Sequence, residues 1–397
     1  MTTTTNNEQK KLNVPNLRFK EFQGEWEKCK VSDLLDFYST NSLSWDKLEY
    51  GTTNIQNLHY GLIHVGLPTM VDIEKDNLPN IIDGNVPKNY ELCKEGDIVF
   101  ADASEDTNEV AKAVEYYNLN GKKVVCGLHT IHGRDNKNKT VVGYKGYAFS
   151  SMSFHHQIRR IAQGTKIYSI NTKNFSECYV GIPSKEEQQK IADLLRLIDE
   201  RIATQNKIID KLQSLIKGIR NDVFGNLRKN IGFNAVVGDV LDYEQPQPYI
   251  VENTEYTAEG IPVLTANKAF VLGYTSETNG IYDKGDCILF DDFTLDCKYV
   301  DFPFKVKSSA IKILTAKNKE LLRYTFEFLK YLDLSTDEHK RHYIAETQNQ
   351  GIILPTEQMV KTIAHIFSTL SLRMETAVKQ RNVFEKQKQY LLRQMFI

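Results

Sequence analysis

A long helical segment occurs twice in this chain, and the two copies align without a gap at a separation of 172 residues. The first copy, residues 182–224, reads IPSKEEQQKIADLLRLIDERIATQNKIIDKLQSLIKGIRNDVF, and the second, residues 354–396, reads LPTEQMVKTIAHIFSTLSLRMETAVKQRNVFEKQKQYLLRQMF. Few identities remain, but the apolar positions match through most of the first half of the alignment. The repeat implies a chain built from two equivalent halves.

Both copies carry the apolar periodicity of a long amphipathic helix. In the first copy the a, d and e positions of successive heptads are mostly apolar, which makes a stripe wide enough for more than one partner. Because an isolated helix of this length needs a partner, we expect the two copies to pair as an antiparallel coiled coil, with apolar surface left for other subunits. The predicted pairing and docking residues are Ile191, Leu195, Ile198, Ile202, Ile209, Leu212 and Ile216 in the first helix, and Ile363, Phe367, Leu370, Met374, Phe384 and Leu391 in the second.

The start of each helix is marked by a proline and a capping residue. Ser184 and Glu187 form an S-x-x-E pattern, which predicts a capping box with two reciprocal hydrogen bonds. Thr356 can cap the second helix, but Met359 and Val360 stand where the first helix has Glu187 and Gln188. If the Glu-Gln pair contacts a partner subunit, the two docking sites differ.

The two segments that precede the helices also resemble each other. VSDLLDF (31–37) matches VGDVLDY (237–243), and EGDIVFAD (95–102) matches KGDCILFD (284–291). A Gly-Asp turn followed by an apolar run is typical of a turn entering a buried strand. We therefore predict two α/β domains related by an internal pseudo-twofold duplication. Further predicted strands are 123–127, 140–144, 166–170, 261–264 and 310–314, and residues 321–332 are a predicted helix.

The composition is that of an ordinary globular protein without a membrane-spanning segment. No apolar run approaches the roughly 18–20 residues needed to span a bilayer, and the polar start MTTTTNNEQKKLN lacks the apolar core of a signal peptide. The six cysteines (Cys29, Cys93, Cys126, Cys178, Cys287 and Cys297) are scattered and include no CxxC pair. This spacing favours reduced thiols in a cytoplasmic protein and argues against a zinc site.

Motifs for catalysis are weak or missing. The sequence contains no GxxxxGK[ST] loop, no GxGxxG after a strand and no [DN]PP[YF] motif. Asp97 or Asp102 followed by Glu109 and Lys112 resembles the magnesium site of a nuclease, but a solvated surface explains the pattern better. The pairs His129/His132, His155/His156 and His339/His342 lack other ligands at typical metal spacing, and we interpret them as polar surface.

Positive charge gathers in one part of the first globular segment. Residues 121–173 contain ten Lys or Arg side chains with Asp135 as the one acidic residue, and aromatic and amide side chains lie among them. Cations that bind phosphates beside groups that read base edges are typical of a DNA-binding face. The second segment, 232–353, is acidic overall and gives a weaker version of the pattern. The predicted DNA contacts are Lys122, Lys123, Arg134, Lys137, Lys139, Lys145, Arg159 and Arg160, and then Lys305, Lys307, Lys312, Lys340 and Arg341.

The whole pattern resembles the specificity subunit of type I restriction-modification systems. The resemblance rests on the order domain, helix, domain, helix, on the opening I-P-x-x-x-E-Q-x-x-I at residues 182–191, and on VPNLRFKEFQGEWE at residues 14–27. It implies a disordered leader (1–13), a first target recognition domain (14–181), a conserved spacer helix (182–224), a second recognition domain (225–353) and a second spacer helix (354–397).

The resemblance further implies a function in DNA recognition without catalysis by this chain. Each recognition domain would read one half of a split double-stranded DNA target, and the helices would space the halves and dock two modification (methyltransferase) subunits. Two restriction subunits, which are ATP-dependent translocases and endonucleases, would complete the complex. We expect no cofactor on this chain, with S-adenosylmethionine, ATP and Mg²⁺ on the partners. Two alternatives remain: a duplicated helical-hairpin scaffold that binds only proteins, and a nuclease using Glu109 and Lys112.

Overall fold

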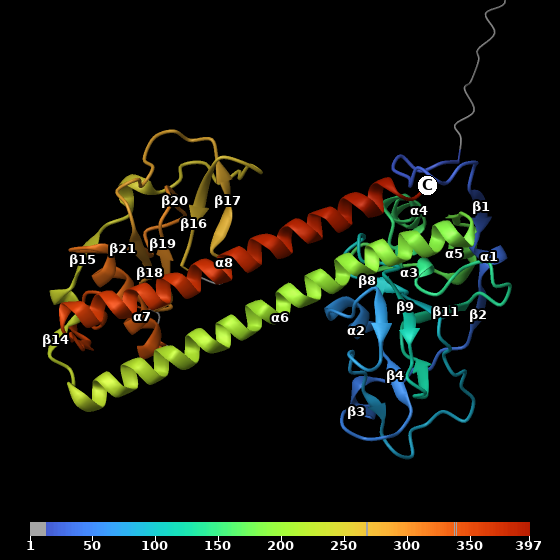
Figure 1. Cartoon of the computed structure of the whole chain (residues 1–397), viewed down its shortest axis with the longest axis horizontal. Helices are drawn as coiled ribbons and strands as arrows, with labels where there is room; N and C mark the ends of the chain where they lie inside the picture. The colour runs from blue at the N-terminus through green and yellow to red at the C-terminus, as the bar shows by residue number, and fades with distance from the viewer. Residues whose placement is uncertain (1–12, 267–268, 337, 339) are drawn as a thin grey trace, which may run out of the picture. The chain divides into compact units, whose positions relative to one another are not determined.

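The computed structural model describes residues 13–266, 269–336, 338 and 340–397, which form two compact units (Figure 1). Unit 1 contains the chain up to Thr204 together with Gln380–Ile397, and unit 2 contains Gln205–Lys379. Each unit therefore combines one globular segment with part of each long helix. The predicted leader, residues 1–13, lies outside the described residues except for Asn13.

The main sheet of unit 1 is built around the predicted Gly-Asp strand. β7 (Ile98–Ala101) follows Asp97 directly, and all four of its residues are buried. The sheet has the order β2-β11-β7-β9-β5, antiparallel except where β5 runs parallel to β9. Its other strands are β2 (Asp36–Tyr38), β11 (Thr130–Arg134), β9 (Ala113–Asn118) and β5 (Met70–Asp72).

A second, smaller sheet and two strand pairs complete the β-structure of unit 1. The smaller sheet has the order β10-β4-β6-β3, with β10 (Val124–Cys126) parallel to β4 (Gln56–Leu58). A strand pair of β1 and β13 closes the segment just before the first long helix begins. The remaining strands are β6 (Asn80–Ile81), β3 (Leu48–Glu49), β1 (Glu27–Lys30), β13 (Tyr179–Ile182), and the pair β8 (Ala103–Ser104) and β12 (Tyr168–Ser169).

Unit 2 repeats this plan. Its main sheet has the order β15-β21-β18-β19, a smaller sheet has the order β17-β16-β20, and β14 pairs with β22 before the second long helix. The Gly-Asp turn again enters a fully buried strand, β18 (Cys287–Asp291). The other strands are β15 (Leu241–Glu244), β21 (Ile311–Ala316), β19 (Cys297–Val300), β16 (Ile261–Leu264), β17 (Val271–Thr275), β20 (Lys305–Val306), β14 (Ala235–Val236) and β22 (Gly351–Ile352).

The predicted duplication is confirmed by the matching topology of the two units. In both main sheets the strand after the Gly-Asp turn pairs on one side with the next strand of that sheet along the chain and on the other side with a later strand. The order β2-β11-β7-β9 in unit 1 therefore corresponds to β15-β21-β18-β19 in unit 2. In both smaller sheets an early strand pairs in parallel with a later one, β4 with β10 and β16 with β20. The sequence echoes at 31–37 and 95–102 thus mark equivalent positions in one repeated fold.

Most predicted short elements are present, and one is wrong. The predicted helix 321–332 lies inside α7 (Lys319–Leu332), and the predicted strand 261–264 is β16. Residues 140–144, predicted as a strand, instead form a turn that enters α3 (Tyr144–Phe149). The carboxylate of Asp135 accepts hydrogen bonds from both the backbone N–H and the hydroxyl of Thr140, and Gly143 adopts a φ of +94°. The other short helices are α1 (Val31–Leu34), α2 (Tyr60–Val65), α4 (Met152–Ile161) and α5 (Thr172–Ser176).

The first long helix, α6 (Lys185–Asn230), begins as predicted but ends later. The predicted helix ended at Phe224, yet residues 225–230 are helical. Phe224 and Leu227 are both buried in the core of unit 2. Burying these side chains outweighs the roughly 1 kcal/mol that a glycine costs inside a helix. The second long helix, α8 (Glu357–Gln394), begins after Thr356, whose hydroxyl accepts from the Met359 N–H at 3.4 Å.

Only half of the predicted capping box forms at the start of α6. The Ser184 hydroxyl accepts from the Glu187 N–H at 3.3 Å, but the Glu187 carboxylate binds the guanidinium of Arg18 at 2.7 Å. The Gln188 side chain accepts from the Val141 N–H and donates to the Lys139 carbonyl. Glu187 and Gln188 are both buried. These two side chains therefore fasten the globular segment of unit 1 to its helix, which argues against their contacting a partner subunit.

Within each unit the two long helices pair in opposite directions. In unit 1 the start of α6 packs on the end of α8: Lys388 forms an ion pair with Asp199 at 2.7 Å, and Arg201 lies over the ring of Phe384. In unit 2 the end of α6 packs on the start of α8, where Phe224 stacks on Phe367 with ring centroids 6.4 Å apart. The antiparallel pairing is confirmed, and the predicted residues Ile191, Leu195, Ile198, Ile209, Ile216, Ile363, Phe367 and Leu391 are buried, with Ile202, Leu212, Leu370, Met374 and Phe384 partly buried.

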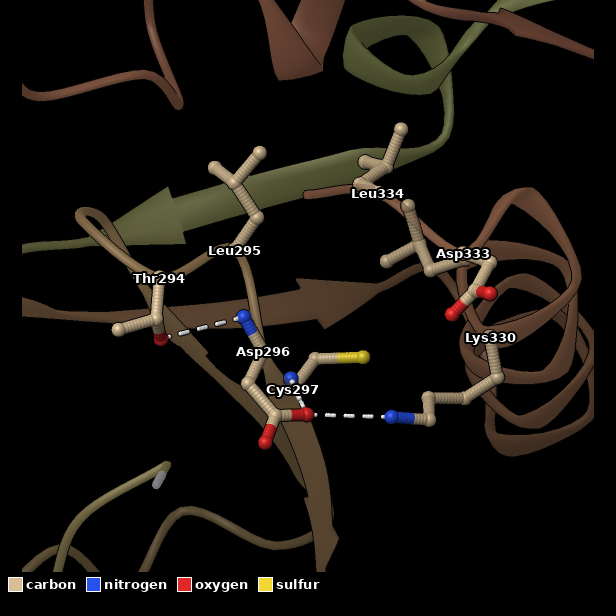
Figure 2. A pocket seen from close by; sticks show the side chains of 8 residues that line it. Thr294, Leu295, Asp296, Cys297, Lys330, Asp333 and Leu334 are labelled. Carbon is tan, nitrogen blue, oxygen red and sulfur yellow. Dashed lines mark hydrogen bonds and ion pairs between the residues drawn. The ribbon is translucent and has the colours of Figure 1, made fainter. Parts of the chain in front are cut away.

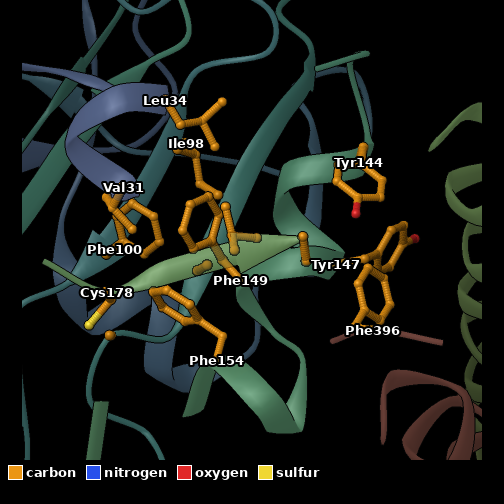
Figure 3. Close-up of a cluster of buried hydrophobic side chains, with 14 of the residues drawn as sticks. Val31, Leu34, Ile98, Phe100, Tyr144, Tyr147, Phe149, Phe154, Cys178 and Phe396 are labelled. Carbon is orange, nitrogen blue, oxygen red and sulfur yellow. The ribbon is translucent and has the colours of Figure 1, made fainter. Parts of the chain in front are cut away.

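The core of unit 1 is rich in aromatic side chains and includes the last residues of the sequence. Phe100 and Phe154 pack edge-on against Phe149, with ring centroids 5.0 and 4.7 Å away (Figure 3). Phe396 lies against Tyr144 at 6.0 Å and against Trp26 at 6.4 Å. Residues that are far apart in the sequence thus share one core.

Phe396→Ala should destabilise unit 1 selectively. Removing a buried phenylalanine leaves a cavity that costs roughly 3 kcal/mol, which lowers the midpoint of thermal unfolding by about 6–12 °C in a unit of this size. The two tryptophans of the chain, Trp26 and Trp45, both lie in unit 1. Tryptophan fluorescence during heating of the full chain therefore reports this unit. Tyr390→Ala, at a half-exposed position near the end of α8, is the matched control. Equal shifts for both variants would contradict the placement of Phe396 in the core of unit 1.

Candidate nucleic-acid interface

Arg134, one of the predicted DNA contacts, is buried and ion-paired inside unit 1. Its guanidinium donates two hydrogen bonds to Asp97 at 2.8 Å and one to Glu91 at 2.7 Å, and it lies over the ring of Tyr38. Burial alone would raise the pKa of Asp97, but hydrogen bonds from His132 and Arg134 hold that pKa below its ordinary value. Arg134 is therefore engaged inside the domain and is not available to a phosphate.

Three predicted lysines are buried in the same way. Lys145 pairs with Glu115 at 3.0 Å, Lys305 with Glu277 at 2.8 Å, and Lys312 lies 3.6 Å from Asp292 and donates to Gln245. All three side chains are at most 4% exposed. Because breaking a buried ion pair is strongly destabilising, the structure contradicts DNA contact for Arg134, Lys145, Lys305 and Lys312. These residues stabilise the folds of units 1 and 2 instead.

Lys122 and Lys123 are exposed at one end of the smaller sheet of unit 1. They precede β10, and the Lys123 carbonyl accepts from the Gln56 N–H at the start of the parallel strand β4. Asn54, two residues before β4, lies at this end as well, and its side-chain NH2 group donates to the Ile81 carbonyl and to Asp83. The exposed ring of Tyr50 follows β3, which is the opposite edge strand of this sheet. Two lysines and the side chain of Asn54 thus share one end of the sheet. The sequence analysis predicted the lysines but missed Asn54, which is distant in sequence.

The other basic residues of unit 1 lie elsewhere on its surface. Lys137 is exposed and donates to the Asp33 carbonyl, and Lys139 is half-buried and pairs with Glu27 at 2.6 Å. Arg159 and Arg160 are exposed in the last turn of α4, where positive charge also suits the helix dipole. The predicted basic stretch is therefore several separate surface sites rather than one face.

In unit 2 the surviving candidates are mostly balanced by acids. Lys307 is exposed. Lys340 bridges Glu338 and Glu346, whose hydrogen bonds raise the pKa of the lysine, and Arg341 lies over the ring of Phe293. His342, predicted as polar surface, is buried against Glu346, and its pair member His339 lies outside the described residues. Unit 2 therefore offers less unpaired positive charge than unit 1.

An open pocket of about 410 Å³ lies in unit 2 between the turn before β19 and the end of α7 (Figure 2). Asp296 and Lys330 point toward each other with 3.1 Å between their charged atoms, so their charges largely cancel. Burial raises the pKa of Cys297 to about 12, which keeps its thiol protonated at neutral pH. The walls of the pocket mix leucine side chains with charged ones, and its thiol is not activated as a nucleophile.

The proposed nuclease residues do not form a metal site. The carboxylate of Asp97 is paired with His132 and Arg134. Asp102 lies against His129, and Glu109 pairs with Lys112 at 2.7 Å. Within the described part of the chain, neither Asp102 nor Glu109 belongs to a group of three possible metal ligands. The geometry gives the nuclease alternative no support.

Apolar residues also lie exposed on both long helices. Leu197, Ile208 and Leu215 of α6 are 40–51% exposed, although Ile208 and Leu215 occupy the d position of the apolar heptad pattern. The a and e positions are buried or partly buried instead, because they face α8 and the globular segments. A heptad count alone could not show which side of the wide stripe stays open. The exposed set on α8 is Met359, Ile366, Leu372, Val383 and Tyr390.

No helix among the described residues is long and apolar enough to cross a membrane.

Comparison with known proteins agrees with the architecture. Residues 23–214 match the family model of the type I restriction modification DNA specificity domain. The EcoR124I/EcoR124II specificity subunit of Escherichia coli is 45% identical over 126 residues, which cover 30% of this chain and 31% of that subunit. A protein of Methanocaldococcus jannaschii, assigned as the MjaX type I restriction enzyme specificity subunit, is 23% identical over 96% of this chain and 95% of its own length.

The fold is also similar to that of a solved structure. The S subunit of a type I restriction-modification system from M. genitalium superimposes with a TM-score of 0.63, at 16% identity, over 97% of this chain and 99% of that chain. Two recognition folds, each leading into a long helix, are thus a known arrangement. The chain thus matches the type I restriction modification DNA specificity domain over residues 23–214, and its duplicated fold is similar to that of an S subunit of a type I restriction-modification system.

Proposed function

We propose that this chain reads a bipartite double-stranded DNA target, with one half-site for the recognition segment of each unit. The observation that carries the proposal is the repeated strand order, which gives the two units equivalent folds and therefore equivalent means of meeting DNA. Two readers in one polypeptide contact two half-sites at a spacing that the intervening protein sets. The continuous helices α6 and α8 provide such a connection.

Unit 1 offers a surface that suits this role. Lys122 and Lys123 supply charge for phosphates, and the side-chain oxygen of Asn54 can accept a hydrogen bond while its NH2 group is held by Asp83 and the Ile81 carbonyl. Phosphate contacts fix the position of a protein on DNA, and amide contacts to base edges give specificity. In unit 2 the exposed candidates are Lys307, Lys340 and Arg341. Its acidic surroundings make non-specific attraction weaker there, so that base contacts carry more of the binding.

The helices supply the second part of the proposal, the docking of two modification subunits. Leu197, Ile208 and Leu215 remain exposed after α6 has packed on α8 and on the recognition segments. Exposed apolar side chains on a long helix are a common feature of protein interfaces. In the complete complex two restriction subunits would join, and the complex would act in the cytoplasm against foreign DNA.

In this assembly the chain itself carries no catalytic residue. Asp102 and Glu109 belong to no group of three possible metal ligands among the described residues, and the thiol of Cys297 stays protonated, which supports this part of the proposal. Methyl transfer from S-adenosylmethionine, and translocation and cleavage with ATP and Mg²⁺, would take place on the partners. The chain would decide where those reactions occur.

Co-expression of this chain with the modification subunit encoded beside it should produce N6-methyladenine at a two-part motif. The host should lack other adenine methylation, and long-read sequencing gives the motif and its gap directly. A control culture expresses the modification subunit alone and should show no such motif. An uninterrupted motif would contradict the two-reader proposal, and failure of the two proteins to assemble would favour the protein scaffold.

The double variant Lys122→Glu/Lys123→Glu should weaken DNA binding by the complex of this chain with its modification subunits. Loss of two phosphate contacts lowers the affinity on the order of tenfold and reduces the slope of log K against log salt by about 2. Fluorescence anisotropy of a labelled duplex at several salt concentrations measures both. Lys20→Glu, which changes an exposed lysine outside the basic stretch, is the control. An unchanged salt slope in the double variant would remove this edge from the interface.

A further inference from the structure

Two cysteines and a histidine converge in the interior of unit 1. The Sγ atoms of Cys93 and Cys126 and a ring nitrogen of His132 all lie within 4.8 Å of one another. All three side chains are buried, at 6%, 1% and 0% exposure. Thiolate sulfur and imidazole nitrogen are the ligands that zinc prefers in structural sites. The cluster therefore supplies three of the four ligands that a structural zinc ion uses, in a buried position.

The three residues come from segments that the fold brings together. Cys126 ends β10 of the smaller sheet, and His132 lies in β11 of the main sheet. Cys93 precedes β7, and its N–H donates to the Val124 carbonyl of β10 at 2.8 Å. The cluster thus joins the two sheets of the recognition fold. A spacing of 33 residues between the cysteines hides this arrangement from a search for CxxC.

The hydrogen bonds of His132 prepare it as a ligand. Its Nε2 lies 2.7 Å from the Asp97 carboxylate, which Arg134 holds in place by two hydrogen bonds. Since Asp97 is an acceptor, Nε2 carries the proton and Nδ1 carries the lone pair. Nδ1 is buried and has no hydrogen-bond partner among the described residues. A metal-bound histidine whose other nitrogen donates to a carboxylate is the common arrangement around zinc.

The separation of the sulfurs fits a shared ion better than a covalent bond. Cys93 Sγ and Cys126 Sγ lie 3.5 Å apart. Two sulfurs each about 2.3 Å from a tetrahedral zinc are roughly 3.8 Å apart, whereas a disulfide bond measures about 2.05 Å. The buried hydroxyl of Tyr116 lies beside the same two cysteines and can donate to a thiolate sulfur.

We propose that Cys93, Cys126 and His132 bind one structural zinc ion that locks the two sheets of the first recognition fold together. Two thiolates would balance the charge of Zn²⁺, and Asp97 is already balanced by Arg134, so the occupied site is close to neutral. Binding releases the two thiol protons. This inference departs from the expectation, drawn from cysteine spacing, that the chain holds no zinc. It does not depend on the proposed function, because a folded recognition domain would need the ion whatever it binds.

Metal analysis of the full chain tests the proposal. Protein purified without chelators should contain one zinc ion per chain by plasma mass spectrometry, and Cys126→Ala and His132→Ala should lose most of it. Cys178→Ala is the matched control, since Cys178 is an equally buried thiol of unit 1 outside the cluster, and it should retain the ion. Zinc that survives in Cys126→Ala, or that is lost equally in Cys178→Ala, would overturn the assignment.

A measurement on the unmodified chain avoids the risk that a variant fails to fold. After zinc is removed with a chelator, added Co²⁺ should produce the visible bands of tetrahedral coordination together with a sulfur-to-cobalt charge-transfer band. Absence of both zinc and these bands would overturn the proposal. Detection of a Cys93–Cys126 disulfide by mass spectrometry of the unreduced protein would overturn it as well, because thiolates joined in a bond cannot bind the ion.

Discussion

The structure depends on the burial of one wide apolar stripe along the two long helices. If the apolar stripe covered only the contact between α6 and α8, the two helices would pair without holding the globular segments. Here the a and e positions of α6 are shared, so that Leu195 and Ile198 belong to the same core as Tyr144 and Phe149 in unit 1. The hydrophobic effect is non-directional and scales with area. Polar contacts therefore decide how each globular segment is oriented on its helix, at the helix start in unit 1 and between α6 and α7 in unit 2.

Buried charges provide that orientation, and they explain why a count of basic residues overestimated the DNA interface. Lys145 and Lys312 lie in strands and helices whose neighbours are carboxylates, and their desolvation is tolerable only because each is paired. The sequence shows the sign of the charge on a side chain, but it does not show whether that charge meets a phosphate outside the protein or a carboxylate inside it. The residues that remain available, such as Lys122 and Arg160, lie in turns or at a helix end.

The parts of the fold that sequence predicted were those with a strong local pattern. The Gly-Asp turns before β7 and β18, the period of α6 and α8, and the duplication itself all depend on hydrophobic order that survives divergence. The helical residues 225–230 were missed because a glycine is a weak obstacle when Phe224 and Leu227 are buried on either side. The approach of Cys93 to His132, and of Asn54 to Lys123, depends on strand topology, which no local window contains.

The two units differ most in how they fasten their recognition segment to the helices. Unit 1 uses a buried ion pair, in which Arg18 binds Glu187, together with the hydrogen bonds of Gln188. At the equivalent position of α8, Val360 packs in the apolar core of unit 2, and Met359 is exposed. Unit 2 instead joins α6 to α7 through Arg220 and Glu327 at 2.7 Å. The two helix starts therefore differ at residues 187 and 188 because each unit attaches its globular segment in another way. In unit 1 the attachment is polar and lies at the start of α6. In unit 2 the start of α8 is apolar, and the ion pair lies between α6 and α7.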